Sequence, residues 1–336
     1  MKNKMRIAII GCGAIAGNHV KGVLASGQEL CALCDVDPAQ SARILEKYEL
    51  GSLPTYTDYR QMLDRERPDV VHVCTPHHLH AEMCIEALAR QIHVLCEKPL
   101  AISMEQLAAI EKAAKESRAQ LGVCLQNRYE PNILHARKLA LETGIRAAYG
   151  DVVWNRDAAY YASGEWRGRW ETEGGGVMIN QALHTLDLLQ WICGMPTHVT
   201  AHISNDHLKD AIEVEDTAAA RFTCADGSVF HIFATTGAGA SFPAHLRFSL
   251  KDKRCLHAET NLLTLGGTSL EHEDSTAFSG KAVWGTGHKA LIHDFYRCIQ
   301  ESLPFPIDAR EGSKVVRLIL SMYASKGENL EILELD

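Results

Sequence analysis

The stretch RIAIIGCGAIAG, from Arg6 to Gly17, decides the fold of this chain. An apolar run of strand length meets Gly11, Gly13 and Ala16, which form the pattern G-x-G-x-x-A, and a helical segment follows. The first glycine permits a tight turn, the second lets the backbone approach a pyrophosphate, and the small third residue lets helix and strand pack closely. The stretch therefore predicts a dinucleotide-binding βα unit, with the phosphates held by Gly11, Gly13, Ala14, Ile15 and Ala16.

The alternation of short apolar runs with amphipathic helical segments continues through residues 1–124. Such alternation is typical of a parallel, doubly wound sheet, so we expect an N-terminal NAD-binding Rossmann domain over these residues. Strands are predicted at Arg6–Ile10, Glu29–Cys34, Val70–Cys74, His93–Cys96 and Gln120–Cys124, and helices at Pro38–Lys47, His80–Arg90 and Met104–Ser117.

The pattern changes after Asn127, and the runs VTAHIS, DTAAARFTC, SVFHIFATTG and AHLRFSLKD alternate with the period of strands. They predict an antiparallel sheet. The stretch Gly174–Trp191 opens with three glycines and then has the apolar spacing of a helix, and two more helical segments are expected around His288–Ser302 and Ser313–Lys326. Residues 125–336 are therefore expected to form a second domain of the α+β class. Its large, mainly antiparallel sheet is expected to be open on one face, and the whole chain falls in the α/β class.

Composition and charge narrow the class of protein. The 336 residues are 46% hydrophobic and 23% charged, as in ordinary globular proteins, and the net charge of −8 comes without a basic stripe that would favour nucleic acid. No segment approaches the roughly 18 apolar residues of a membrane helix. The eleven cysteines lie mostly in apolar surroundings, so we expect a cytoplasmic protein. The C-x-x-C spacing of Cys31 and Cys34 falls in a buried strand without a second pair, which favours packing over a redox or metal role.

The second predicted strand ends at Asp35. A carboxylate at this position accepts hydrogen bonds from the ribose hydroxyls of NAD and repels the additional phosphate of NADP. No arginine follows directly to bind that phosphate, whereas Asp37 before Pro38 suits a helix cap. The sequence therefore predicts NAD as the cofactor.

Three further motifs carry a resemblance to a known family. They are TPHHLH at Thr75–His80, CEKPLA at Cys96–Ala101 and the segment GGGVMINQALHTLD at Gly174–Asp187. Together they resemble the Gfo/Idh/MocA oxidoreductases, which include glucose–fructose oxidoreductase and inositol dehydrogenase. The likeness extends to VEDTA around Glu215 and to EGSKVVRLILSMYAS near the C-terminus.

The resemblance implies roles for individual residues. Lys98 matches the family's active-site lysine and His184 its catalytic histidine. Asn180 stands where many inositol dehydrogenases have aspartate, and His77 where asparagine is common, which argues against inositol and leaves the redox assignment unchanged. The cofactor-binding residues implied outside the glycine loop are Asp35, Thr75, Pro76, His77, His80, Glu97 and Lys98.

The residue types fit proton handling during hydride transfer. An imidazole titrates near neutral pH and suits general base work at His184, while the Lys98 ammonium would stabilise a developing alkoxide. The sequence leaves open which of the two holds the proton at each stage. Asn180 can orient a substrate hydroxyl or the imidazole. Asp187 would orient His184 or, as we favour, form a salt bridge elsewhere.

The flanking segments add weaker expectations. The three glycines before the His184 helix would let substrate and backbone approach closely. In the loop NRDAAYYASGEWRGRWETE, Trp166 and Arg167 are the expected contacts to a sugar ring, and a subunit interface is the alternative. Trp191 is expected to pack. No metal site is predicted, because nothing near His77, His78 and His80 completes a ligand set.

The predicted function is an NAD-dependent dehydrogenase or reductase acting on a secondary hydroxyl or ketone of a sugar, glycoside or polyol. Three alternatives remain: a nucleotide-sugar or uronate dehydrogenase, a glycosidase that uses transient oxidation by NAD, and a non-enzymatic NAD-binding sensor. The expected partners are a small carbohydrate and further copies of the chain, in a homodimer or homotetramer formed through the C-terminal sheet.

Overall fold

The computed structural model describes residues 4–259, 261–270 and 287–334, and its contacts divide the chain into two units. The first unit comprises Met1–Ala101, Glu105–Gln126 and Gly287–Ser313. The second comprises Ile102–Met104, Asn127–Thr286 and Lys314–Asp336. The stretch Gly287–Ser313, which the sequence analysis grouped with the second domain, thus packs within the first unit.

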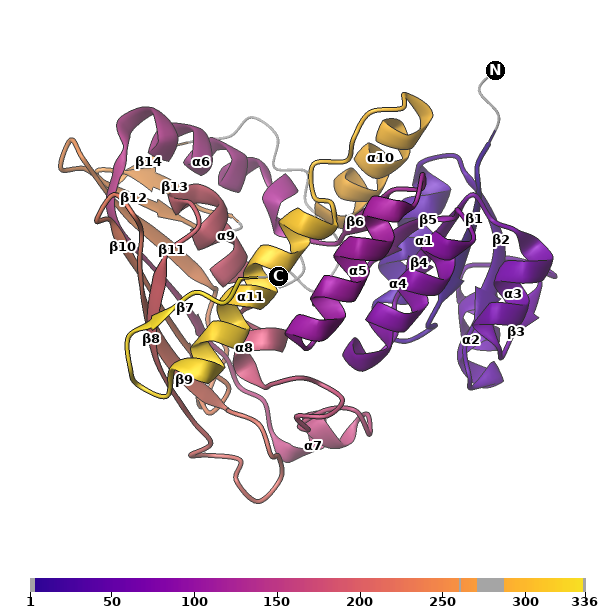
Figure 1. Ribbon diagram of the computed structural model, residues 1–336, viewed down its shortest axis with the longest axis horizontal. Helices are drawn as coiled ribbons and strands as arrows, with labels where there is room; N and C mark the ends of the chain where they lie inside the picture. The colour runs from indigo at the N-terminus through magenta and orange to yellow at the C-terminus, as the bar shows by residue number, and fades with distance from the viewer. Residues whose placement is uncertain (1–3, 260, 271–286, 335–336) are drawn as a thin grey trace. The chain divides into compact units, whose positions relative to one another are not determined.

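The first unit contains a six-stranded sheet with the order β3-β2-β1-β4-β5-β6, in which all the pairings are parallel (Figure 1). The chain order reverses beside β1, which lies between β2 and β4, and ligands of such sheets bind at the carboxyl ends of strands at that point. The predicted doubly wound sheet is confirmed. The strands are β1 (Arg6–Ile10), β2 (Glu29–Cys34), β3 (Thr55–Tyr56), β4 (Val70–Val73), β5 (His93–Cys96) and β6 (Leu121–Val123).

Two of the helices that accompany this sheet begin at an aspartate cap. Asp37 accepts a hydrogen bond from the Ala39 backbone N–H with Pro38 in the first turn, which confirms Asp37 as a helix cap. The helices are α1 (Ala16–Ala25), α2 (Pro38–Lys47), α3 (Tyr59–Glu66), α4 (His80–Ala89), α5 (Met104–Glu116) and α10 (Gly287–Gln300), with short 3₁₀ turns at His77–Leu79 and Gln126–Tyr129.

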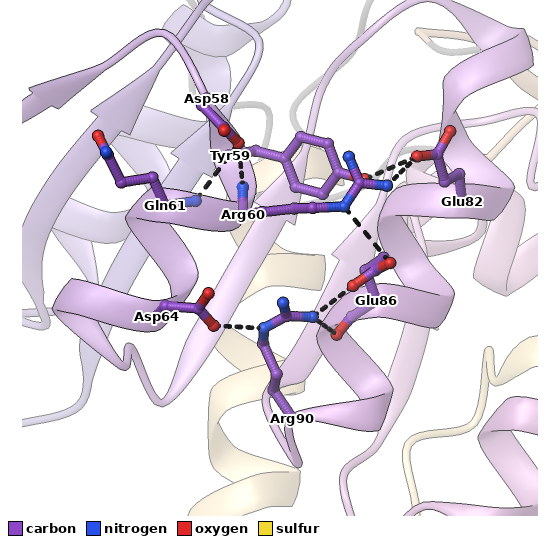
Figure 2. Close-up of polar contacts among 8 residues, drawn as sticks. All are labelled: Asp58, Tyr59, Arg60, Gln61, Asp64, Glu82, Glu86 and Arg90. Atoms are coloured by element: carbon purple, nitrogen blue, oxygen red, sulfur yellow. Dashed lines mark hydrogen bonds and ion pairs between the residues drawn. The ribbon is translucent and has the colours of Figure 1, made fainter.

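Helices α3 and α4 are joined by a surface network of ion pairs (Figure 2). The Arg60 guanidinium pairs with Glu82 and, at 3.4 Å, with Glu86. Arg90 bonds the carboxylates of Asp64 and Glu86, at 2.8 and 2.5 Å. Because most of these side chains are solvent-exposed, each pair contributes only about 0–1 kcal/mol, and the network mainly fixes how the two helices lie on each other.

Helix α10 covers the first unit through glycine contacts. A Cβ atom on Gly22 of α1 would lie 2.4 Å from the Ile292 side chain, and one on Gly122 of β6 would lie 2.9 Å from Phe295 and Phe305. Only glycine leaves room for this approach. The C-terminal segment therefore completes the core of the N-terminal sheet.

The second unit is built on a nine-stranded sheet with the order β14-β13-β12-β11-β7-β10-β9-β8-β15. Its pairings are antiparallel except for β7 with β10, so the predicted mainly antiparallel sheet is confirmed. The strands are β7 (Ile145–Val153), β8 (His198–Ser204), β9 (Thr217–Thr223), β10 (Val229–Thr235), β11 (His245–Leu250), β12 (Cys255–Ala258), β13 (Leu263–Leu265), β14 (Thr268–Ser269) and β15 (Leu330–Glu331).

Among the described residues, helices cover one face of this sheet and none covers the other. Gly150 of β7 lets α9 approach, since a Cβ atom there would lie 2.7 Å from the Thr185 methyl group. On the opposite face Tyr149 and Phe233 are exposed. Within the described residues, no helix has both the length and the hydropathy to cross a membrane. The helices are α6 (Pro131–Thr143), α7 (Ala158–Ala162), α8 (Val177–Asn180), α9 (Leu183–Cys193) and α11 (Ala309–Ser325).

Candidate functional site

The glycine loop after β1 has the shape of a phosphate cradle. Gly11 has φ +89°, and a Cβ atom there would lie 2.6 Å from the Cys74 carbonyl oxygen, so only glycine fits. Gly13 is exposed, and a Cβ atom there would meet nothing within 4 Å. Helix α1 starts at Ala16 without a side-chain cap, which leaves its first N–H groups to an anion. The loop residues therefore fit the dinucleotide phosphates predicted from the sequence.

Asp35 lies at the end of β2, beside this loop. Its carboxylate accepts hydrogen bonds from the backbone N–H of Cys12 at 2.7 Å and of Asp37 at 2.9 Å. A carboxylate has lone pairs beyond these two, so ribose hydroxyls can also donate to it. Arg43, which the sequence analysis did not consider, donates to the Cys12 carbonyl at 3.3 Å. A cation thus lies at the same loop although no arginine follows Asp35 directly.

His80 ties the Thr75–His80 loop to the Glu-Lys-Pro motif. Its Nδ1 lies 2.7 Å from the Pro99 carbonyl oxygen and its Nε2 lies 2.8 Å from the Thr75 carbonyl oxygen. Burial lowers the pKa of His80, against the opposite effect of these two carbonyls. Because both ring nitrogens face carbonyl oxygens, this ring fixes the backbone on either side of the motif rather than offering a metal ligand.

Glu97 is the end point of a buried hydrogen-bond chain. Its Oε1 lies 2.9 Å from His19 Nε2 and 3.2 Å from His288 Nε2. His19 Nδ1 lies 2.9 Å from His72 Nδ1, and His72 Nε2 lies 2.9 Å from the Tyr296 hydroxyl. The sequence analysis missed these four partners, which come from α1, β4 and α10.

The hydrogen bonds between these side chains all run in one direction, toward Glu97. Burial lowers the pKa of His72 and raises that of Tyr296, so a neutral ring receives a phenol proton. Burial alone would raise the pKa of Glu97, but the hydrogen bonds from His19 and His288 outweigh it and lower the pKa. Tyr296 therefore donates to His72, His72 to His19, and His19 to an ionised Glu97. This chain holds a carboxylate directly before Lys98.

The glycine triplet serves internal packing in the second unit. Cβ atoms on Gly174, Gly175 and Gly176 would lie 2.4 Å from Ile102, 2.0 Å from the Tyr323 hydroxyl and 1.9 Å from the Glu215 carbonyl oxygen. The sequence analysis expected the glycines to admit a substrate. Protein atoms of the same unit instead occupy the space that their side chains would fill.

Glu215 anchors the start of α8 and was not among the predicted site residues. Its carboxylate accepts hydrogen bonds from the N–H groups of Gly176 at 2.8 Å and Met178 at 3.0 Å, and from the Tyr323 hydroxyl at 2.8 Å. Burial raises the pKa of Glu215 to about 7, although the three donors act in the opposite direction. The VEDTA motif therefore holds the segment that leads to Asn180.

The helix predicted between the glycine triplet and Trp191 is wrong in one respect, because it is broken after Asn180. The N–H groups of Gln181 and Ala182 both donate to the Val177 carbonyl, at 3.1 and 2.8 Å, which widens the last turn of α8. Helix α9 then restarts at Leu183, with the half-buried His184 in its first turn.

Asn180 is oriented by a buried acid that the sequence analysis missed. The Asn180 side-chain amide donates to Glu173, which is fully buried and also accepts the Gly168 backbone N–H. Glu173 directly precedes the glycine triplet, and this position in the sequence is the feature from which its role could have been predicted. The amide of Asn180 is thus held by the loop that carries Trp166 and Arg167.

Asp187 and Trp191 have structural roles on α9. Both oxygens of Asp187 accept from Arg128, at 2.8 and 2.6 Å, and both side chains are buried. This confirms the salt bridge that we favoured for Asp187. The guanidinium groups of Arg128 and Arg137 lie 5.1 and 4.4 Å from the Trp191 ring centre, so this tryptophan packs against cations.

The aromatic loop forms a stacked cluster within the second unit. The Arg167 guanidinium lies 4.4 Å from the Trp166 ring centre and 4.6 Å from that of Tyr160. It also donates to the Tyr160 hydroxyl at 2.9 Å, and the same hydroxyl lies 3.2 Å from the Gln181 amide nitrogen. The sequence-predicted Trp166 and Arg167 therefore contact each other, and Tyr160 connects them to the segment between Asn180 and His184.

Comparison with known families gives one match within each unit. A profile described as an oxidoreductase family with an NAD-binding Rossmann fold matches residues 5–125, and a GFO/IDH/MocA C-terminal domain matches residues 144–251. The chain belongs to the Gfo/Idh/MocA family. This confirms the predicted resemblance and the prediction of NAD as cofactor.

Curated relatives of this Gfo/Idh/MocA chain include named dehydrogenases. The D-glucoside 3-dehydrogenase of Escherichia coli (strain K12) is 31% identical over 208 residues, which are 59% of this chain and 57% of that protein. The 4-carboxy-2-hydroxymuconate-6-semialdehyde dehydrogenase of a Sphingobium species is 30% identical over 193 residues, 56% of this chain and 59% of that protein. Each alignment covers less than two thirds of the relative's length.

Solved structures of the family match over nearly the full chain. The WlbA dehydrogenase from Bordetella pertussis, crystallised with NADH and UDP-GlcNAcA, superimposes with a TM-score of 0.88 at 27% identity, covering 100% of this chain and 99% of that one. Levoglucosan dehydrogenase with NADH and levoglucosan gives 0.88 at 20% identity, covering 99% and 100%, which supports the fold alone.

Proposed function

We propose that this protein is an NAD-dependent oxidoreductase that transfers hydride between nicotinamide and a secondary hydroxyl or ketone of a sugar, glycoside or polyol. The main support is the phosphate cradle. There the exposed Gly13 and the uncapped start of α1 lie beside Asp35, within the residues that match the NAD-binding domain of the family. In functional terms, residues 1–124 bind NAD, and residues 125–336 bind substrate and associate with other copies.

Lys98 and His184 are the proposed catalytic residues. NAD supplies the hydride acceptor, so the protein has to hold the alcohol and receive its proton. The Lys98 ammonium stabilises the alkoxide oxygen, and His184 acts as general base. Family membership supports both residues. In addition, the buried Glu97 directly precedes Lys98, and the break between α8 and α9 places His184 in the first turn of α9.

The proposed substrate-binding residues are Asn180, Trp166 and Arg167. Glu173 holds the Asn180 amide and Tyr160 holds Arg167, which supports this role, since a binding site needs side chains held in fixed rotamers. The proposed cofactor set outside the glycine loop remains Asp35, Thr75, Pro76, His77, His80, Glu97 and Lys98.

A nucleotide-sugar or uronate dehydrogenase is the second candidate. The relative that favours it is the WlbA dehydrogenase, 27% identical over the full chain and crystallised with UDP-GlcNAcA. In that case Arg167 would bind the anionic part of the substrate, because a guanidinium pairs with carboxylate or phosphate.

A substrate panel separates the candidates. The protein is incubated with NAD⁺ or NADP⁺ and with free sugars, glycosides, polyols and UDP-sugars, while NADH absorbance and glycoside cleavage are followed. NADH formation with neutral sugars supports the leading proposal, and formation restricted to UDP-sugars or uronates supports the second. Cleavage without net NADH identifies a glycosidase, and tight NAD binding without turnover identifies a sensor. The NADP⁺ arm tests whether Arg43 overrides Asp35.

The catalytic assignment is tested with His184→Ala and Lys98→Ala. Each variant is expected to lose turnover by about 10²–10⁴-fold while NAD binding, followed by fluorescence, is retained for His184→Ala. His293→Ala, at an exposed position of α10, is the matched control and keeps full activity. Wild-type turnover in His184→Ala removes this residue from the mechanism.

Assembly and location complete the proposal. The uncovered sheet face with exposed Tyr149 and Phe233 supports a homodimer or homotetramer through the C-terminal sheet. Sedimentation of wild type and Phe233→Glu tests it, since the substitution is expected to shift the protein to a smaller species. The eleven free cysteines support a cytoplasmic location, where thiols stay reduced.

A further inference from the structure

A row of ligand-type side chains crosses three neighbouring strands on the uncovered face of the second unit. Asp151 of β7 pairs with His245 of β11, and the register continues with Leu246 opposite Ala258, which places Glu259 opposite His245. His257 precedes Glu259 by two residues and shares its face, because side chains alternate along a strand. Two imidazoles and two carboxylates, distant in sequence, therefore meet on one patch of the sheet.

Two separations within this row match those between ligands of a tetrahedral metal ion. His245 Nε2 lies 3.3 Å from Glu259 Oε1, and His257 Nε2 lies 3.2 Å from the same oxygen. Two donors bound at about 2.0–2.1 Å to one ion at the tetrahedral angle lie about 3.3 Å apart. One ligand atom from each of the three residues falls within 4.8 Å of the others.

These contacts are not ordinary hydrogen bonds. The His257 Nε2 atom is shielded from solvent and makes no hydrogen bond, although Glu259 is close. The Asp151 Oδ1 atom is likewise shielded and has no hydrogen bond, 3.5 Å from His245 Nδ1. Buried polar atoms without partners are uncommon in native proteins. The His245 and His257 rings stand at 85° to each other, so their nitrogens converge on a shared point rather than stack.

We propose that His245, His257 and Glu259 form a binding site for a divalent transition-metal ion of the zinc class. Two imidazoles with one carboxylate are a ligand set that zinc accepts, with a fourth position left for water. Asp151 acts on the opposite side of the His245 ring, where a carboxylate facing Nδ1 fixes the tautomer that presents Nε2 to the ion.

The local charge favours a cation. Asp151 and Glu259 supply two carboxylates to the patch, against the one guanidinium of Arg247, the cross-strand neighbour of His257. The Arg247 guanidinium lies 5.6 Å from the Tyr149 ring centre. An ion at the three ligands would tie β11 to the end of β12 across the sheet. No metal site was predicted at these positions, and no sequence spacing marks one, since the ligands lie on different strands and converge only through the register.

Cobalt provides a direct test with the full-length protein. The protein is treated with chelator, desalted and titrated with Co²⁺ and then with Zn²⁺, without NAD or sugar. Wild type is expected to bind one ion per chain with the visible absorption of tetrahedral Co²⁺, which Zn²⁺ displaces. His257→Gln and His245→Gln are expected to lose this site, and Asp151→Asn to bind about 10–100-fold more weakly.

Two matched variants guard the interpretation. Cys255→Ser removes an exposed thiol two residues before His257, and His231→Gln removes an exposed imidazole on β10. Both are expected to retain the cobalt spectrum, and circular dichroism confirms that the glutamine variants fold. Loss of binding in Cys255→Ser with retention in His257→Gln would overturn the proposal, as would a wild type that binds no ion more tightly than His257→Gln.

Discussion

Glu97 in the first unit and Glu215 in the second are both buried carboxylates beside a motif of the candidate site, yet their pKa values shift in opposite directions. Burial raises the pKa in both cases. The imidazoles of His19 and His288 outweigh it at Glu97, whereas two backbone N–H groups and the Tyr323 hydroxyl do not at Glu215. The type of donor, more than the number of hydrogen bonds, thus decides which glutamate stays ionised.

The largest expected effect comes from Gly176→Ala, which disrupts the packing of the start of α8 against Glu215. The added Cβ would lie 1.9 Å from the Glu215 backbone oxygen, so the start of α8 has to move away from the carboxylate. We expect a loss of about 4 kcal/mol in the free energy of unfolding, measured by urea denaturation, with the Glu97 cluster intact.

Gly13→Ala is the matched control for this substitution. Its Cβ meets nothing within 4 Å, so the free energy of unfolding is expected to change by less than about 0.5 kcal/mol while NAD binding weakens. Equal stability losses in the two variants would contradict the packing explanation for the triplet.

The two glutamates are expected to change the stability of the protein with pH in opposite directions. The pKa of Glu215 rises from 4.5 unfolded to about 7 folded, so the folded state binds the proton more tightly and loses stability as pH rises between these values. The full difference is about 3 kcal/mol. Glu97 has the opposite sign: its contribution is present above about pH 4.5 and is lost as pH falls below it.

Melting temperatures of wild type, Glu215→Gln and Glu97→Gln, measured from about pH 4 to about pH 8, test both signs. Relative to wild type, Glu215→Gln is expected to gain stability as pH rises toward 7. Glu97→Gln is expected to approach wild type only in acid. Parallel curves for wild type and Glu215→Gln would contradict the raised pKa.

The smallest effect is expected from Tyr296→Phe, at the far end of the Glu97 chain. The variant removes the phenol proton given to His72 and leaves a buried ring nitrogen without that donor, which costs about 1–2 kcal/mol. Urea denaturation measures it. The matched control is Tyr59→Phe, whose hydroxyl contacts Glu82 at the surface and contributes about 0.5 kcal/mol or less (Figure 2). A control effect as large as that of Tyr296→Phe would show that burial is not the cause.

Much of the fold follows from local sequence. The strands predicted at Arg6–Ile10, Glu29–Cys34 and His93–Cys96 are observed with these bounds, because each is an apolar run between turn residues. The missed β3 has two residues, and the missed α3 buries only Met62 and Leu63, so neither gives a clear periodic signal.

The candidate site was less accessible to sequence reasoning. The glycine loop and Asp35 were predictable, because their chemistry depends on neighbouring residues. Glu97 takes one partner, His19, from α1 and the other, His288, from α10, 191 residues away, and no spacing rule connects them. Asn180 and His184 suggested one helix, and the break between them arises from a hydrogen-bond shift at Val177 that periodicity does not encode.

The way α10 packs on α1 at Gly22 also has a consequence for synthesis. The ribosome releases β1–β6 well before Gly287–Ser313, yet this late segment supplies Ile292, Phe295 and Tyr296 to the core of the first unit. The emerging N-terminal sheet therefore waits, with an apolar flank uncovered, until the second unit has been translated. A chain that stops before residue 287 is expected to need chaperones or to aggregate, although every strand of its nucleotide-binding sheet is already present.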